Sequence, residues 1–189
     1  MKSVAKIEIF QPGIVIFDPV ALNDFVLSNG IDTGNLFELF LSDETIGLSV
    51  VEKGVIFPIY QIPEMEYSIF LKGTDQDQKS SFNKAVKKFC YSGIPLVVVS
   101  GLVVIADLNA LMNWDSDYFL DYREACVDGL GNNDYLEVAS GLYDLSISGV
   151  MGLGEPFVSL GYELEFKSVA QFPKLPNDAY TDDWDFSIT

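Results

Sequence analysis

The feature that most constrains the fold is a succession of short apolar runs separated by turn-forming residues. Residues 6–10 and 14–17 are two such runs, with Gln11-Pro12-Gly13 between them. Short runs rich in β-branched and aromatic residues, bounded by glycine or proline, are typical of strands, and the ten runs of this chain predict about nine strands. The other runs cover residues 45–52, 55–62, 65–71, 96–99, 102–105, 135–139, 142–148 and 158–168.

Helical patterns are expected over three segments. Residues 21–28 follow Asp18-Pro19 and end before Asn29-Gly30, which are common start and stop signals. Residues 74–91 begin with a threonine that can cap a helix, carry acids in the first turn and carry lysines near the end. Residues 108–127 are expected to be partly helical, with an acidic face.

The order of these elements predicts the fold class. The strand runs follow one another as hairpins and do not alternate with helices, which disfavours a parallel sheet. We therefore predict a mainly β protein, an antiparallel β-sandwich or barrel with two or three helical insertions (α+β). We expect one β-rich domain over residues 1–172 and an acidic tail at 173–189. A division into two similar halves, at about 1–92 and 93–172, is the alternative.

The charge excludes several classes of partner and of chemistry. The chain has 11 Lys and Arg residues against 28 Asp and Glu residues, a formal net charge of −17. Such a chain repels polyanions, so neither nucleic acid nor a membrane is expected as a partner. The chain contains no histidine, which excludes imidazole-based triads and His-ligated zinc. No signal peptide is visible, and a cytoplasmic location is expected.

No motif supports catalysis, and neither a cofactor nor a metal is expected. The glycine-rich stretch 149–156 lacks the order of a dinucleotide or P-loop motif and is expected to join two strands. The acidic stretches 115–117 and 128–134 depart from the pattern of a calcium loop. Cys90 and Cys126 lie among apolar residues and are expected to be reduced, buried thiols, with a single disulfide as the alternative.

The distribution of charge is the most informative feature for function. Residues 1–88 hold 12 acidic and 8 basic side chains, whereas residues 89–189 hold 16 acidic and 3 basic ones. Aromatic residues stand among the acids in two segments, 114–128 and 178–186. In a binding surface, aromatic rings supply anchors and carboxylates steer a basic partner. In the alternative interpretation, the acids form a solvated face and the rings lie in the core.

This interpretation defines a set of candidate partner-binding residues. We expect charge pairing with lysine or arginine of the partner at Asp117, Asp121 and Glu124 above all. The full set is Trp114, Asp115, Asp117, Tyr118, Asp121, Glu124 and Asp128, with Asp182, Asp183, Trp184 and Asp185 in the tail.

The second half of the chain carries a family resemblance. Gly93-Ile94-Pro95-Leu96-Val97-Val98 is followed by an apolar return run at 101–106, and later by Ser140-Gly141-Leu142-Tyr143-Asp144-Leu145-Ser146-Ile147. This pattern resembles the DNA-entry nuclease inhibitors of the competence-J family, with residues 74–92 and 107–134 as insertions. The resemblance implies an acidic inhibitor of a nuclease and carries over no individual functional residue. Bacterial toxin-immunity proteins, which are small, acidic and non-catalytic, are similar in outline.

Together these observations predict a bacterial immunity or inhibitor protein, an antitoxin that is not an enzyme. Its partner would be a basic toxin, a nuclease above all, because an acidic surface can occupy the cleft where phosphates bind. A ligand-binding or enzymatic β-barrel with an aromatic-lined pocket is one alternative, and a structural assembly subunit is another. The oligomeric state stays open.

Overall fold

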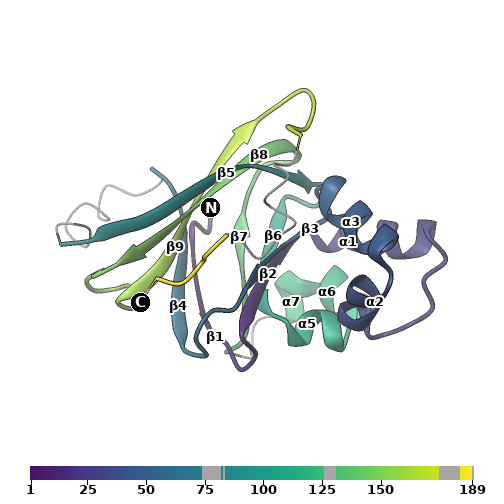
Figure 1. Ribbon diagram of the computed structural model, residues 1–189, viewed down its shortest axis with the longest axis horizontal. Coiled ribbons are helices and arrows are strands. Elements are labelled where there is room, and N and C mark those ends of the chain that lie inside the picture. Colours follow the sequence, from purple (N-terminus) through teal and green to yellow (C-terminus); the bar gives the residue numbers. More distant parts are fainter. Residues whose placement is uncertain (74–81, 83, 126–130, 175–183, 189) are drawn as a thin grey trace.

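The strands of the chain form two open sheets in the computed structural model, which describes residues 1–73, 82, 84–125, 131–174 and 184–188 (Figure 1). The five-stranded sheet has the order β1 (Val4–Glu8), β4 (Glu66–Leu71), β9 (Leu160–Ser168), β8 (Gly141–Met151) and β5 (Val86–Val98). The four-stranded sheet has the order β3 (Ile56–Tyr60), β2 (Gly13–Phe17), β6 (Leu102–Asp107) and β7 (Asn133–Glu137).

The two sheets pack face to face around the main hydrophobic core. Alternate residues of each strand point into this core, as Tyr162 and Leu164 do on β9, while Glu163 and Glu165 face outward. The predicted α+β sandwich is therefore confirmed, and the barrel is not formed. Neighbouring strands are antiparallel except for β4 and β9, which run parallel. Core residues from both sheets include Ile7, Ile14, Ile69, Leu96, Val103, Leu136, Leu145 and Leu164.

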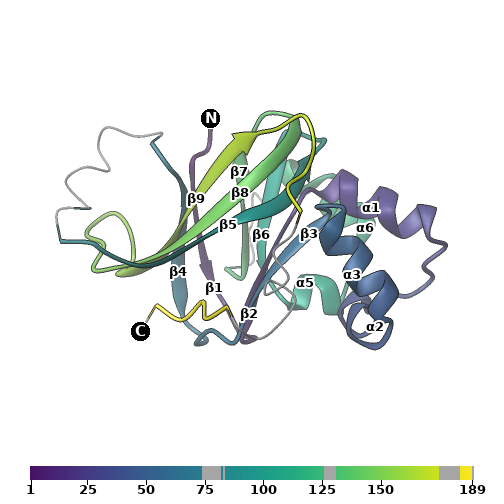
Figure 2. The same cartoon turned by 45° about the horizontal axis from the view of Figure 1, so that its top comes forward.

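Helices cover the other face of the four-stranded sheet and gather at one end of the molecule (Figures 1 and 2). Val15, Phe17 and Val104 point to this face and contact the helices in a second hydrophobic cluster. The described residues contain six helices, more than the two or three insertions expected. Their bounds are α1 (Pro19–Ser28), α2 (Leu36–Ser42), α3 (Glu44–Glu52), α5 (Asn109–Met112), α6 (Ser116–Leu120) and α7 (Tyr122–Ala125). None of these helices is long and apolar enough to cross a membrane.

The start and stop signals of the first helix are confirmed. The side chain of Asp18 accepts hydrogen bonds from the backbone nitrogens of Val20 and Ala21, and Pro19 occupies the first turn. The helix ends at Ser28 with Asn29 as its C-cap, and Gly30 has a positive φ of 61°, which glycine adopts readily. The partly helical character expected for residues 108–127 is also confirmed over the described residues, by α5, α6 and α7.

The tight hairpins predicted over residues 6–17 and 96–105 are wrong, because the two strands of each lie in different sheets. β1 pairs with β4, whereas β2 pairs with β3 and β6. β5 pairs with β8, whereas β6 pairs with β2 and β7. The turns at residues 11–13 and 99–101 therefore carry the chain from one sheet to the other. β4 likewise joins β1 and β9, and does not lie beside β3.

Two segments have a different secondary structure from the one expected. Residues 45–52 form α3 where a strand was predicted, because Asp43 caps the helix and one stripe around Val50 is buried against the second cluster. Residues 86–91 belong to β5 where a helix was predicted. Phe89 and Tyr91 alternate inward there, as strand residues do. Residues 74–81 and 83 of that predicted helix lie outside the described residues.

The cysteine at residue 90 also differs from the expectation. Cys90 is exposed on β5 and has a free thiol, whereas burial was predicted. Its apolar neighbours misled the prediction, because in a strand they point to the opposite face. Cys126 lies outside the described residues.

A buried carboxylate holds one of the corners between the sheets. Asp107 Oδ2 lies 3.2 Å from the backbone nitrogen of Phe10 and 3.0 Å from Asn109 Nδ2. Asp107 Oδ1 lies 3.0 Å from the backbone nitrogen of Asn109 and 3.2 Å from Asn132 Nδ2. The carboxylate thereby joins the β1–β2 corner, the start of α5 and the approach to β7. Four donors around it offset the cost of burying the charge.

Candidate functional site

The negative charge of the chain is concentrated on the helices. We use the name helical layer for residues 18–52 and 109–125, which carry α1–α3 and α5–α7. Residues 18–52 contain seven acidic side chains and no basic one, and residues 109–125 contain four acidic and one basic. The helical layer thus holds ten of the seventeen net negative charges. Two segments that are distant in sequence contribute to the same end of the fold (Figure 2).

Five acids outside the helical layer form ion pairs in the described part of the chain: Glu66, Asp134, Glu137, Glu163 and Glu165. Lys72 Nζ lies 2.6 Å from Glu165, and Lys87 Nζ lies 2.6 Å from Glu163, both across strands of the five-stranded sheet. The hydrogen bond that Lys72 donates to Glu165 raises the pKa of Lys72 above its usual value. Lys2 pairs with Asp134, and Lys6 with Glu66.

The acids of the helical layer have no such partners in the described part of the chain. Nine of them are exposed and form no ion pair with lysine or arginine: Asp24, Asp32, Glu38, Glu44, Glu52, Asp115, Asp117, Asp121 and Glu124. Arg123, the basic residue within this layer, is directed to β7, where its guanidinium lies 3.3 Å from Glu137. A hydrogen bond from the Lys2 backbone nitrogen, together with nearby positive charges, lowers the pKa of Glu137. The layer is therefore an uncompensated acidic surface.

The predicted carboxylates of the first segment lie on this surface. Asp117 is in α6, Glu124 is in α7, and Asp121 stands between the two helices. Asp115 caps α6, with Oδ1 3.1 Å and 3.2 Å from the backbone nitrogens of Asp117 and Tyr118. Asp128, Asp182 and Asp183 lie outside the described residues.

The predicted aromatic anchors of that segment pack largely inward. Trp114 stacks on Phe119, with ring centroids 5.2 Å apart, and meets the edge of Phe17. Tyr118 contacts Phe119 and Tyr122 edge-on. Both predicted anchors are half-buried, so they present only part of their rings to a partner. This arrangement agrees with the alternative in which the rings serve the core.

The described tail residues, Trp184 and Asp185, lie elsewhere, beside the core between the two sheets. Trp184 stacks on Tyr91 of β5 with ring centroids 4.6 Å apart. Phe186 is buried beside it, and its carbonyl oxygen accepts a hydrogen bond from the Tyr162 hydroxyl at 3.0 Å. Asp185 is exposed next to them. The four-stranded sheet separates this group from Trp114, so the structure does not bring the two predicted segments together.

Sequence reasoning missed the apolar side chains that the helical layer exposes. Leu27 on α1 is 69% exposed, Leu41 on α2 is 64% exposed and Leu120 on α6 is 42% exposed. Leu48 on α3 and Val99 beside the β5–β6 turn are exposed as well. The helical periodicity of α1 could have predicted that Leu27 is exposed. Leu22, Phe25 and Val26 define the buried stripe of this helix, and Leu27 is not part of it. These leucines stand among the unpaired carboxylates.

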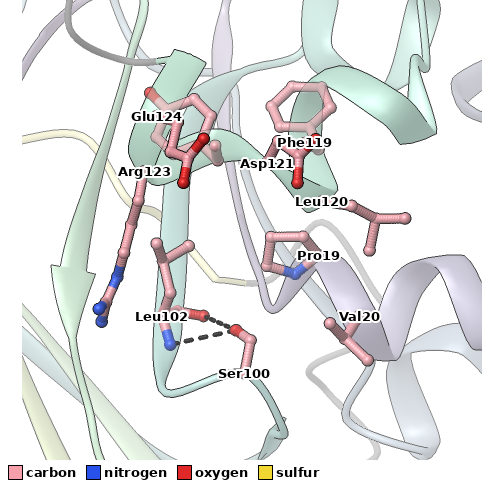
Figure 3. A pocket seen from close by; sticks show the side chains of 10 residues that line it. Pro19, Val20, Ser100, Leu102, Phe119, Leu120, Asp121, Arg123 and Glu124 are labelled. Atoms are coloured by element: carbon pink, nitrogen blue, oxygen red, sulfur yellow. Dashed lines mark hydrogen bonds between the residues drawn. The ribbon is translucent and has the colours of Figure 1, made fainter.

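A pocket opens within the helical layer, between the start of α1, the β5–β6 turn and the α6–α7 junction (Figure 3). Its volume is about 230 Å³. Leu102 and Phe119 are buried residues of its wall, and Asp121 and Glu124 supply carboxylates. A second groove of about 250 Å³ is lined by asparagines and by Asp115. Among the described residues, no group of three or more His, Cys, Asp or Glu side chains could hold a metal ion.

The aromatic residues between the sheets contact one another instead of lining a barrel. Tyr67 and Tyr162 lie with ring centroids 5.5 Å apart, and Phe57 meets Phe186 edge-on. These contacts fill space between the sheets, which weighs against an aromatic-lined ligand pocket there.

Comparison with known proteins adds a structural similarity. No protein-family model matches the chain, and no curated protein matches it in sequence. The fold is similar to the crystal structure of ComJ, inhibitor of the DNA degrading activity of NucA, from Bacillus subtilis. The alignment covers 88% of this chain and 95% of ComJ, at 13% sequence identity and a TM-score of 0.42. The chain is thus similar in structure to a nuclease inhibitor of the kind that its strand patterns resemble.

Proposed function

We propose that the protein is a non-catalytic inhibitor, of the immunity or antitoxin kind, that binds a basic protein through the helical layer. One observation carries the proposal: nine exposed carboxylates of this layer lack a cation within the described residues, whereas Glu66, Asp134, Glu163 and Glu165 of the sheets are paired. Like charges held on one face repel one another, and a basic partner relieves that repulsion. The same field accelerates the encounter with such a partner.

A nuclease is the partner class that fits this surface best. Proteins that bind DNA neutralise phosphates with lysine and arginine, so their clefts are positive. A surface rich in carboxylates presents the same sign of charge as the phosphates and competes for the same cleft. ComJ is described as an inhibitor of the DNA degrading activity of NucA. Our argument rests on the charges and on the exposed leucines.

The cytoplasm is the proposed location. Cys90 is exposed with a free thiol, which suits a reducing compartment.

The test combines capture, identification and inhibition. The tagged full chain is used to capture binding proteins at low and at moderate salt, and the captured nuclease is then purified and assayed for DNA degradation. We expect stoichiometric inhibition by the full chain, with an affinity that falls as salt rises. A captured nuclease that stays fully active in the complex would contradict the proposal.

A matched pair of variants shows whether the helical layer is the contact. The triple variant Asp117→Lys, Asp121→Lys and Glu124→Lys reverses three charges on α6 and α7. The control, Glu8→Lys, Glu64→Lys and Glu66→Lys, changes the net charge equally at exposed positions beside the five-stranded sheet. We expect the first variant to lose affinity by about a hundredfold or more, and the control to lose much less. Equal losses would assign the effect to net charge alone and overturn the assignment of this surface.

A further inference from the structure

The pocket in the helical layer is built from three separate parts of the chain. Pro19 and Val20 come from the start of α1, Ser100 from the β5–β6 turn, and residues 119–124 from α6 and α7. Its volume is about 230 Å³. Sites for small-molecule ligands are larger, about 300–1,000 Å³.

The walls of the pocket combine an apolar base with negative charge. Leu102 and Phe119 are buried, and Leu120 is exposed at the edge. Asp121 and Glu124 lie on the α6–α7 side, opposite Ser100 (Figure 3). Arg123 also lines the pocket, and its guanidinium pairs with Glu137 of β7.

Hydrogen bonds keep these walls in place before any partner arrives. Ser100 donates from its backbone nitrogen and from Oγ to Asp18 Oδ2, at 2.7 Å and 2.8 Å. Its Oγ also accepts from the backbone nitrogen of Leu102 at 3.2 Å. On the opposite side, the backbone nitrogen of Glu124 lies 2.9 Å from the carbonyl oxygen of Asp121. A preformed pocket loses little conformational entropy when it is filled.

We propose that this pocket receives one arginine side chain of the basic partner, an inference that rests on the proposed function. The aliphatic stem of an arginine would lie along Pro19 and Leu120, and its guanidinium would reach Asp121 and Glu124. A guanidinium is planar and offers five donors, so it can pair with two carboxylates at once. Buried arginines of this kind are frequent hot spots of protein interfaces.

The neighbouring groove offers a poorer match to a cation. Its lining includes Asn109, Asn113, Asn132 and Asn133, which are neutral. Its one carboxylate, Asp115, already accepts two backbone hydrogen bonds at the start of α6. Charge complementarity therefore selects the pocket beside Asp121 and Glu124.

The experiment uses single-residue probes and the full chain. N-acetyl-arginine-N-methylamide is titrated into the ¹⁵N-labelled protein and followed by NMR, in parallel with the lysine and citrulline analogues. Citrulline has nearly the shape of arginine but no charge. We expect saturable shifts with arginine at residues 19–20, 100–102 and 119–124, weaker shifts with lysine, and no saturation with citrulline.

Two variants with the same loss of charge separate the pocket from the general field. Asp121→Asn with Glu124→Gln is expected to weaken arginine binding by about tenfold. Glu38→Gln with Glu44→Gln, on α2 and α3, is expected to change it by less than about twofold. Retained dispersion of the amide spectrum shows that each variant is folded. Equal losses in both variants, or equal binding of arginine and citrulline, would overturn the inference.

The outcomes also separate this inference from the proposed function. If the arginine probe fails to bind while the triple lysine variant still weakens binding of a nuclease, the pocket assignment alone is wrong. If the probe binds at the pocket but the captured nuclease stays active, the arginine site stands as a binding site and the inhibitor function is wrong.

Discussion

Asp18 and Ser100 are joined by two hydrogen bonds across the border between α1 and the β5–β6 turn. Asp18 Oδ2 lies 2.7 Å from the Ser100 backbone nitrogen and 2.8 Å from its Oγ. Asp18 Oδ1 accepts from the backbone nitrogens of Val20 and Ala21 at 2.9 Å and 3.0 Å. The carboxylate is fully buried, and these donors offset the cost of burying its charge. One side chain thereby starts a helix and aligns two walls of the pocket.

Removing this carboxylate should destabilise the whole domain. We expect Asp18→Ala to lower the free energy of unfolding by about 3 kcal/mol, because it leaves buried backbone donors without acceptors. Ser100→Ala removes one hydroxyl donor and should cost about 1 kcal/mol. Urea denaturation followed by far-UV circular dichroism measures both values. A change below about 0.5 kcal/mol for Asp18→Ala would refute the role of the carboxylate.

The C-terminal segment should behave as part of the core. Phe186 and Ile188 are buried between the sheets, although residues 184–188 form neither helix nor strand. We expect Phe186→Ala to cost about 3–5 kcal/mol and Ile188→Ala about 2–5 kcal/mol in unfolding free energy. Leu41→Ala, at an exposed position of α2, serves as the control and should cost less than about 1 kcal/mol. Similar midpoints for the Phe186 and Leu41 variants would mean that the segment does not pack as described.

The exposed leucines should contribute to binding more than to folding. Leu120→Ala is expected to lower affinity for the captured nuclease by about tenfold, since covering an exposed leucine in an interface removes its apolar surface from water. Its free energy of unfolding should fall by less than about 1 kcal/mol. Isothermal titration calorimetry gives the affinity, and Val86→Ala on β5 is the matched control at an exposed apolar position. If the control weakens binding as much as Leu120→Ala, the contact does not lie on the helical layer.

Stability should fall at alkaline pH through the buried tyrosines. Burial raises the pKa of Tyr67 to about 12, and its hydroxyl donates to the Pro63 carbonyl oxygen at 2.8 Å. An unfolded tyrosine ionises near pH 10 while the folded one keeps its proton, so rising pH lowers the free energy of the unfolded state relative to the folded state. The contribution of Tyr67 is therefore complete below pH 10 and is lost as pH rises toward 12.

A phenylalanine variant isolates this effect from other titrating groups. Tyr67→Phe should be less stable than the parent by about 1 kcal/mol at pH 7, because the hydrogen bond is lost. Denaturation midpoints at pH 7, 10 and 11.5 should show that difference shrinking and then reversing. A difference that stays constant across this range would contradict the raised pKa.

Local patterns predicted individual elements well where one face of an element is buried. The strict alternation from Tyr162 to Lys167 matches β9, and the signals around Asp18 match the start of α1. Where β-branched residues occur in a helix, the pattern was misleading, as in α3. There the cap at Asp43 and packing against the sheet outweighed strand propensity.

The candidate site was predictable in its charge and not in its shape. Asp117, Asp121 and Glu124 are exposed as expected, because carboxylates avoid burial unless they are satisfied. The direction in which Trp114 points, the leucines that stand exposed and the pocket at Asp121 depend on packing between separate helices. No local pattern contains that information.

The amino-acid sequence by itself determined the net charge, the absence of histidine and the face that most strands bury. The side-chain period of a strand specifies its buried face, but it does not specify which strand lies alongside. The tertiary structure decided that β1 and β2, and β5 and β6, separate into different sheets. It also decided that cations pair with acids of the sheets while residues 18–52 and 109–125 form one acidic layer. The physical reason is that electrostatic energy depends on distance in space, and folding sets those distances.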